Sequence, residues 1–520
     1  MKNIIEKIKN ISKEDLTKVF ICTMALIIIL DCDIYLYPFF QSIHLPLPHT
    51  ILTFIWLPLL ILWVFYRLEN NKKKVFIAAL IIGLVYGGYF IVHHLSSHNL
   101  WPILKLTNNF YYDFYQELVY YLSMMMPLFF IYVSYKLDMK MNDFEKMIII
   151  ISCLISIPIL VTNIFACAPS TYEGWTKANF LTWFMGIYDE YTPRELATSF
   201  FFSKGNTTGI VLFMTYPILL NITRKRNTDW KLVCLLIVQG LAMFCLATRV
   251  ATYGVILMIA AYLVIYIFCL ILKKVKFSKK MLFTFLAILA LFVAIFPHSP
   301  AYVNQKINQQ NDWYILEDEE LRQEIKGGLE EIDLDPESQA YKDYWSYIFK
   351  QYAFFLSIPK DYFLKFYDYR FDPKFWVDII FEYDFYDRAS GRDIENIFTK
   401  YKWANLTPTQ KLFGMSYSIP MEGGIVIEQD FVSQYYTHGP VGSFLLCSPW
   451  LIGLVVVIAL AIKNFKKVIG LDILTIGLAY VAGLLAGYNS GHLLCEVFGS
   501  ILLATLLGTL LLKVTKPNEE

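Results

Sequence analysis

The chain has 520 residues, of which 57% are hydrophobic and only 17% are charged. Because about a quarter of the residues in a soluble domain are charged, this composition excludes a soluble globular protein. The formal net charge is +1, so no strong positive field favours nucleic acid as a partner. The nine cysteines stand singly without a CxxC pair, and we expect buried thiols rather than metal or redox ligands.

Apolar runs long enough to cross a bilayer recur along the whole chain. A hydrocarbon core of about 30 Å needs roughly 17–25 mostly apolar residues in a helix. The runs that qualify are, in chain order, 18–40, 50–68, 75–95, 117–135, 147–165, 206–222, 231–248, 250–272, 281–297, 440–462, 468–488 and 492–512. The sequence therefore predicts an all-α, polytopic membrane protein with about 12 transmembrane helices. Residues 1–18 are polar and lysine-rich, and we expect no cleavable signal peptide.

Lysine and arginine are distributed unevenly between the two ends of these runs. If the spans alternate from a cytoplasmic N-terminus, the inner segments hold 26 of the 45 Lys and Arg residues, and the short outer segments hold five. An excess of Lys and Arg marks the cytoplasmic loops of membrane proteins. We therefore expect a multi-pass protein of the cell membrane with both termini in the cytoplasm.

The longest stretch between two spans is 298–437, which this topology places outside the cytoplasm. It carries 24 Asp and Glu residues against 14 Lys and Arg residues, and it is rich in aromatic residues. It divides the chain into a membrane domain with nine spans (1–297), an extracytoplasmic loop domain (298–437), and a last part with three spans and a cytoplasmic tail (438–520).

Two parts of this loop show apolar residues at helical spacing, 341–357 and 375–386. The pattern predicts a large, mostly helical extracytoplasmic loop that packs on the membrane domain. Disorder is the alternative for the acidic stretch 317–337, where Gly327, Gly328 and Pro336 interrupt any pattern.

The histidines all fall on or near the outer face in this topology, at positions 44, 49, 93, 94, 98, 298, 438 and 492. Imidazole is a frequent metal ligand and titrates near neutral pH, which would suit a metal site or a pH sensor. Histidine at a membrane interface is also common without either role. We therefore expect no metal site and no cofactor.

The first candidate site residue is Arg249, in the very short turn between the seventh and eighth predicted spans. It is the only charged residue between positions 232 and 272. A charge at the end of a span is costly and is often functional. The alternative is an anchor whose side chain reaches the lipid head groups.

The second candidate is Arg392, in Ser390-Gly391-Arg392, directly after the aromatic part of the loop. Gly391 allows close approach of the backbone, and the planar guanidinium suits bidentate contact with phosphate. A solvated loop arginine is the alternative.

The third candidate group precedes the tenth span and contains two carboxylates, Glu428 and Asp430. Paired carboxylates beside the membrane suit a general base, because one of them can accept a proton from a nearby hydroxyl. Carboxylates that only make a loop soluble would give the same pattern.

The order of these pieces resembles the O-antigen ligase and Wzy-type polymerase superfamily over about 200–450. Four motifs carry the resemblance and occur in this order: Ser203-Lys-Gly-Asn206-Thr-Thr-Gly209 before a span, Thr248-Arg249 after a span, Ser390-Gly391-Arg392 followed by Leu412-Phe-Gly-Met-Ser-Tyr417 in the outer loop, and His438-Gly439-Pro-Val-Gly442 leading back into the membrane.

In that superfamily, an arginine of a T-x-S-R-like turn and an arginine of the S-G-R loop bind the diphosphate of an undecaprenyl-linked saccharide. The resemblance implies these roles for Arg249 and Arg392. The ligases carry a His-Asn pair eleven residues before the motif that opens the next helix, whereas this chain has Glu428-Gln-Asp430 there. Further motif residues are expected to bind substrate: Lys204, Asn206, Tyr417 and His438.

The resemblance implies a polymerase or ligase of a surface polysaccharide that works without a metal ion. It would transfer a saccharide from undecaprenyl diphosphate to an acceptor glycan at the outer face of the cytoplasmic membrane. The expected partners are the lipid-linked oligosaccharide, the acceptor glycan and membrane lipids.

Two other functions fit the same hydropathy. A transporter or flippase of lipid-linked saccharides would have a similar number of spans, but the halves of this chain lack the similarity of repeat-built transporters. A non-enzymatic assembly or sensor protein would tolerate replacement of Arg249 and Arg392.

Overall fold

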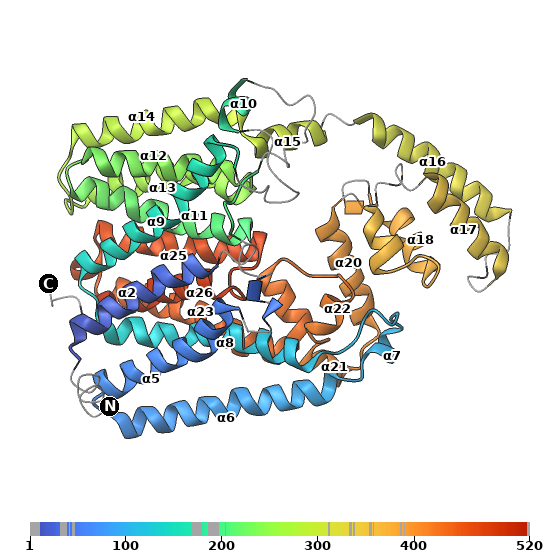
Figure 1. Ribbon diagram of the computed structural model, residues 1–520, viewed down its shortest axis with the longest axis horizontal. Helices are drawn as coiled ribbons and strands as arrows, with labels where there is room; N and C mark the ends of the chain where they lie inside the picture. The colour runs from blue at the N-terminus through green and yellow to red at the C-terminus, as the bar shows by residue number, and fades with distance from the viewer. Residues whose placement is uncertain are drawn as a thin grey trace. The chain divides into compact units, whose positions relative to one another are not determined.

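The computed structural model is built from α-helices, as the composition predicts (Figure 1). It describes residues 11–516 except 32–38, 41, 44–46, 168–178, 186–196, 203, 310–311, 332–334, 336–337, 353–355, 357, 385–386 and 389. Within these residues the β-structure is limited to an isolated bridge between Ser199 and Phe201. The all-α fold class is confirmed.

The chain divides into two compact units. Unit 1 contains Met1–Ile82, Tyr121–Gln305 and Cys447–Glu520, and unit 2 contains Gly83–Tyr120 and Lys306–Leu446. Helices that contribute residues to both units are α6 (Lys72–Ser97), α8 (Phe114–Leu137), α15 (Pro300–Gln309) and α23 (Asp430–Lys463). The boundaries predicted from the sequence, 298 and 437, stay a prediction.

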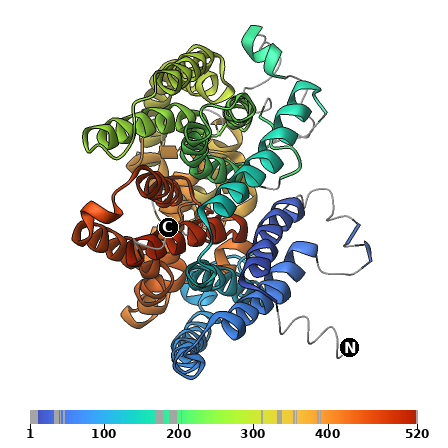
Figure 2. The same cartoon turned by 90° about the vertical axis from the view of Figure 1, so that its left-hand side faces the viewer.

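Unit 1 is a bundle of apolar helices. They are α2 (Lys13–Leu30), α4 (Pro48–Ile51), η1 (Leu52–Trp56), α5 (Leu57–Leu68), α9 (Met141–Ile164), α10 (Phe180–Met185), α11 (Gly205–Lys225), α12 (Trp230–Cys245), α13 (Arg249–Ile271), α14 (Lys279–Ile295), η2 (Phe296–His298), α24 (Phe465–Val468), α25 (Leu471–Ser490) and α26 (Val497–Thr515). Figure 1 shows the long ones lying side by side, and Figure 2 looks along them.

Helix α11 lies at the centre of unit 1, because it contacts α9, α12, α13 and α25. Nearly all of its residues from Gly205 to Thr223 are buried. By contrast, α14 leaves large apolar side chains such as Phe283 and Val293 exposed. A helix buried on all sides belongs to the interior of a bundle, and exposed apolar faces of outer helices suit lipid.

Helices long and apolar enough to span a membrane are abundant in the described part of the chain. Nine qualify by length and composition: Pro48–Leu68, Lys72–Ser97, Phe114–Leu137, Met141–Ile164, Arg249–Ile271, Lys279–His298, Asp430–Lys463, Leu471–Ser490 and Val497–Thr515. The remaining predicted runs overlap α2, α11 and the shorter apolar helix α12. A polytopic membrane protein is confirmed, and the exact number of spans stays a prediction.

Unit 2 contains shorter helices around an aromatic core. They are α7 (Trp101–Leu104), α16 (Asp312–Glu330), α17 (Gln339–Tyr352), η3 (Tyr362–Phe366), α18 (Pro373–Glu382), α20 (Gly391–Ala404), α21 (Pro408–Phe413) and α22 (Ser418–Glu422). Core side chains include Trp345, Trp376 and Phe398. Helices α17 and α18 confirm the helical spacing over 341–352 and 375–382, while 353–355, 357 and 385–386 lie outside the described residues.

The acidic stretch 317–337 is helical as far as Glu330, so disorder does not describe this part of it. Gly327 and Gly328 lie inside α16 rather than ending it. A Cβ atom on Gly328 would overlap the ring of Tyr344 from α17, whose hydroxyl donates a hydrogen bond to the carbonyl of Ile325 (3.2 Å). The glycine here serves helix packing.

Two glycines let two backbone segments of unit 2 cross in direct contact. Gly414 has a φ of +94° and Gly439 has a φ of +66°. A Cβ on Gly414 would overlap the carbonyl of Thr437, and one on Gly439 would overlap the carbonyl of Leu412. Helix α23 is broken at Gly439 for the same reason. This crossing places His438 beside the 414–417 motif.

Candidate functional site

The predicted site residues are distributed over both units. Unit 1 contains Lys204, Asn206 and Arg249, and unit 2 contains the larger group: Arg392, Tyr417, Glu428, Asp430 and His438. Arg249 and Arg392 belong to different units, and their predicted convergence stays a prediction.

Arg392 lies in the first turn of α20. Ser390 is the N-cap, and its side chain accepts a hydrogen bond from the backbone N–H of Asp393 (3.3 Å). Gly391 leaves room for Tyr362, because a Cβ there would lie 2.8 Å from the hydroxyl oxygen of Tyr362 and displace it. The Ser-Gly-Arg motif is thus a helix start that holds the arginine at a defined place.

The guanidinium of Arg392 forms an ion pair with Glu428. Both side chains keep about a third of their surface exposed, 34% for Arg392 and 35% for Glu428. The structure therefore brings together two residues that were singled out separately in the sequence. The pair is accessible from solvent, and an anion that displaced Glu428 would find the arginine already oriented.

Glu395 joins this pair and was missed in the sequence. It lies one turn after Arg392 on α20 and accepts a hydrogen bond from the hydroxyl of Tyr362 (2.7 Å). Burial raises the pKa of the Glu395 carboxyl to about 7, with a further upward contribution from the charge of Glu428. The i, i+3 spacing of Arg392 and Glu395 places both on one helix face, and this signal could have identified it.

Unit 2 also contains a pocket, and some of its lining residues directly precede Glu428 in the sequence. The pocket is small and is lined mostly by apolar side chains, including Met415, Tyr417, Val426, Ile427 and Tyr436. Val426 and Ile427 directly precede Glu428. Asp430, the other predicted carboxylate, is only 2% exposed in the first turn of α23. Of the two predicted carboxylates, Glu428 is therefore the accessible one.

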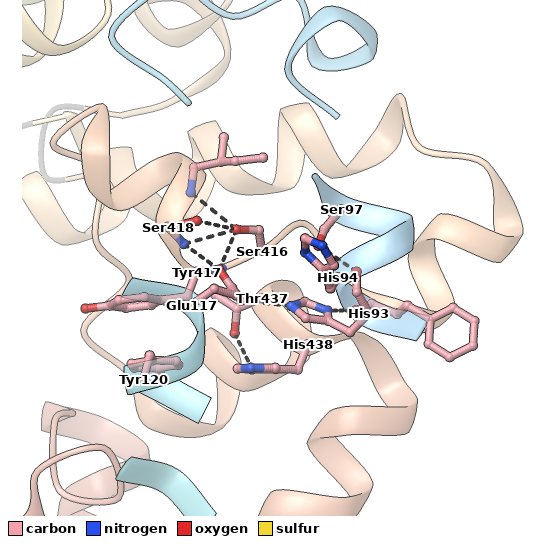
Figure 3. Close-up of polar contacts among 12 residues, drawn as sticks. His93, His94, Ser97, Glu117, Tyr120, Ser416, Tyr417, Ser418, Thr437 and His438 are labelled. Atoms are coloured by element: carbon pink, nitrogen blue, oxygen red, sulfur yellow. Dashed lines mark hydrogen bonds and ion pairs between the residues drawn. The ribbon is translucent and has the colours of Figure 1, made fainter. Parts of the chain in front are cut away.

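A second polar group, centred on Glu117, lies in the interior of unit 2 (Figure 3). The Glu117 carboxylate accepts hydrogen bonds from the hydroxyl of Ser416 (2.7 Å) and from the backbone N–H groups of Tyr417 (3.0 Å) and Ser418 (2.9 Å). Its other oxygen lies 2.8 Å from Nε2 of His93. The carboxylate thereby fixes the backbone of the 416–418 motif.

Tyr417 and His438 belong to this interior group. The ring of Tyr417 stacks on Tyr120 with centroids 3.6 Å apart, and the ring of His438 stacks on Tyr120 from 5.7 Å. His438 is 0% exposed. Contact of either residue with a saccharide stays a prediction.

The predicted residues of unit 1 lie at the adjoining N-termini of α11 and α13. Lys204 is the N-cap of α11 and forms an ion pair with Glu496, while Arg249 is the first residue of α13. The two helix starts touch, because a Cβ on Gly209 would lie 3.1 Å from Thr248 Oγ1, the N-cap side chain of α13. Asn206 is half-buried in the first turn of α11, and Arg249 is exposed.

Helix N-termini and cationic side chains both favour anions. This end of unit 1 is therefore suited to phosphate. The very short turn predicted around Arg249 is confirmed, since α12 ends at Cys245 and α13 begins at Arg249.

A family model described as "O-antigen ligase like membrane protein" matches residues 14–517, almost the whole chain. The chain belongs to this family. The resemblance stated from four short motifs is therefore confirmed and extends over the spans on both sides of them. No curated protein and no solved structure matches the chain. Membership in the O-antigen ligase family indicates polysaccharide polymerase or ligase activity and a multi-pass membrane location.

Proposed function

We propose that this protein transfers a saccharide from a lipid diphosphate, of the undecaprenyl type, to a hydroxyl of an acceptor glycan. The reaction takes place at the outer face of the cytoplasmic membrane, as the excess of Lys and Arg in the opposite loops predicts. The chain thus acts as a polymerase or ligase of a surface polysaccharide.

The observation that carries this proposal is the accessible Arg392–Glu428 pair with Glu395 one helical turn away. A lipid diphosphate leaves as an anion, and a preorganised arginine stabilises the charge as it develops. The guanidinium matches phosphate oxygens with two parallel N–H donors. Glu428 balances the arginine while the site is empty, because an unpaired charge in a partly buried place is unfavourable.

Glu395 is the proposed proton acceptor. An acceptor hydroxyl oxygen attacks the anomeric carbon, the bond from that carbon to the diphosphate oxygen breaks, and the hydroxyl proton passes to the Glu395 carboxylate. A pKa of about 7 is suitable for this role, because the group is partly deprotonated at neutral pH and still basic. Of the two carboxylates expected as the base, Glu428 is instead paired with Arg392, and Asp430 is buried.

A second contact with the diphosphate is proposed for Arg249, on the basis of the family resemblance. Its exposed position at the start of α13 supports binding of an anion. Arginines supply the positive charge in this proposal, so that the diphosphate requires no metal ion. The aromatic residues of unit 2 offer faces on which sugar rings can stack.

The test is polymer or ligated product formed by purified protein from a lipid-linked oligosaccharide, without added metal. Arg392→Lys and Arg249→Lys keep the charge but lose the bidentate fork. We expect each to lower the rate about a hundredfold, as when one transition-state contact is removed. Arg370→Lys is the matched control, because Arg370 is an exposed arginine of unit 2 paired with Asp368.

Unchanged rates in both site variants would refute the catalytic assignment. Reconstituted vesicles then decide between the alternatives. Protein-dependent movement of the lipid-linked saccharide across the bilayer, without any glycosidic bond formed, would identify a transporter.

A further inference from the structure

Three potential metal ligands meet in the interior of unit 2. They are His93 from α6, Glu117 from α8 and His438 from α23, and one ligand atom from each lies within 4.8 Å of the others. All three side chains are fully buried, at 0% exposure. Ionisable residues buried near the ends of membrane helices are costly and therefore point to a specific role.

The hydrogen bonds around His93 fix its tautomer. Its Nδ1 lies 2.6 Å from the backbone carbonyl of Phe413. A carbonyl oxygen can only accept, so Nδ1 carries the proton and donates it. In the neutral ring Nε2 then has a lone pair, and this atom faces a carboxylate oxygen of Glu117 at 2.8 Å.

His438 is held in the same way. Its Nδ1 lies 3.1 Å from the hydroxyl oxygen of Thr437, which donates its own proton to the carbonyl of Ser433 (2.7 Å). Nδ1 of His438 is therefore the donor to Thr437. In the neutral ring, Nε2 of His438 is again the basic nitrogen. The ring centroids of His438 and His93 are 5.0 Å apart.

Two basic nitrogens and a carboxylate oxygen thus converge in a fully buried place, where a cation between them would balance their electron pairs. A proton on His93 would satisfy one contact, with Glu117. A divalent ion satisfies all three at once. Each ligand also has the outer partner that metal ligands typically have: Phe413 for His93, Thr437 for His438, and the 416–418 segment for Glu117.

We propose that His93, Glu117 and His438 bind a divalent transition-metal ion, with Zn²⁺ the best match for two imidazoles and one carboxylate. Binding at about 2.0–2.2 Å from each ligand would tie together the ends of α6, α8 and α23. The inference does not rest on the proposed glycosyl transfer. It replaces the expectation of no metal site, and it makes His438 a metal ligand instead of a substrate contact.

The test measures metal bound to the purified full-length protein in detergent, after exposure to Zn²⁺ and dialysis. We expect about one ion per chain in the wild type and near none in Glu117→Gln and His438→Ala. His98→Ala is the matched control: it removes an exposed histidine just after the end of α6, with its ring 5.5 Å from that of His94, where zinc could bind adventitiously. This control should retain the ion.

A second measurement needs no variant to fold. Zn²⁺ should raise the apparent melting temperature of the metal-stripped wild type, because a ligand that binds only the folded state stabilises it. The extended X-ray absorption fine structure of the zinc-loaded protein should show nitrogen and oxygen neighbours at about 2.0–2.2 Å from the ion.

Three results would overturn the proposal. Loss of zinc from His98→Ala alone would show an adventitious surface site. Equal zinc content in all variants would show the same. A metal-stripped wild type that Zn²⁺ does not stabilise, with ¹⁵N shifts of a doubly protonated His93, would show that a proton is the cation.

Discussion

Opposing influences set the charge of the Glu395 carboxyl. Burial and the neighbouring charge of Glu428 raise its pKa, while the Tyr362 hydroxyl, the Val426 backbone N–H and Arg392 lower it, and the result is about 7. The folded chain therefore holds a proton at pH values where an unfolded chain, with a pKa near 4.5, has released it. The contribution of the Glu395 carboxyl to the stability of the folded chain is therefore fully present below about pH 4.5 and is lost as pH rises through about 7.

We predict that the rate of glycosyl transfer follows the ionisation of Glu395. Below pH 7 the carboxyl is mostly protonated and cannot accept a proton, so the wild-type rate should rise about tenfold per pH unit. Glu395→Gln should lower the rate by about 10²–10⁴-fold and abolish this limb of the pH profile. Initial rates between pH 5 and 8, at roughly half-unit steps, provide the measurement.

The control for this prediction is Glu320→Gln, an exposed glutamate of α16 in the same unit. It should leave both rate and profile unchanged. If Glu395→Gln keeps the wild-type profile, the proton acceptor is a different group, although Arg392 could still bind the diphosphate.

At the scale of elements, the crossing of 412–414 with 437–439 organises unit 2. Gly414 and Gly439 lie in the left-handed region and each approaches the backbone of the other segment. The hydrogen bonds from Met415 N–H to the carbonyl of Tyr436 (2.8 Å) and from Ser416 N–H to the carbonyl of Thr437 (3.0 Å) continue this contact. The crossing thereby presents the Ser416 hydroxyl and the Tyr417 and Ser418 N–H groups to Glu117.

We predict that Gly414→Ala and Gly439→Ala each destabilise the protein by at least about 2 kcal/mol. A non-glycine residue at positive φ costs roughly 1–2 kcal/mol, and the overlap with a backbone carbonyl adds to it because backbone yields little. The apparent melting temperature of purified protein in detergent measures the effect.

Gly87→Ala provides the comparison. A Cβ on Gly87, within α6, meets no atom within 4 Å, so alanine should be tolerated or slightly stabilising. Equal melting temperatures for all three variants would contradict the assigned crossing.

Helices and their order could be predicted because their signals are local. The apolar runs correctly predicted helices, among them α8, α9, α13, α14, α25 and α26. The periodic apolar residues within 341–357 and 375–386 predicted α17 and α18. The site could be predicted only in part. Arg392 and Glu428 were each recognisable by type, but their ion pair joins residues 36 apart through folding of the loop.

The interior group could not have been predicted by spacing. Glu117 meets His93 across 24 residues and Ser416 across 299 residues. Each of these side chains resembles an ordinary interfacial residue in the sequence. These side chains come together only in the folded chain, and their burial distinguishes them from ordinary interfacial residues.

At the scale of the whole molecule, charge distribution is the remaining evidence for orientation. The predicted inner segments hold 26 Lys and Arg residues and the short outer segments hold five. A polymerase that uses a lipid-linked donor also needs its loop and its arginines on the side where the polysaccharide is assembled. If the predicted topology is wrong, the proposed mechanism is therefore wrong as well.

We predict that unit 2 residues of α17 are outside the cytoplasm and that the segment before α14 is inside. Ala340 and Lys276 are both exposed, and each can be replaced by cysteine in a background without the nine native cysteines. A membrane-impermeant maleimide should label Ala340→Cys in intact cells, because no bilayer separates it from the reagent. It should label Lys276→Cys only after the membrane is made permeable. The reverse pattern would place Arg392 in the cytoplasm, where it could not serve extracytoplasmic glycosyl transfer, and the proposed function would have to be abandoned.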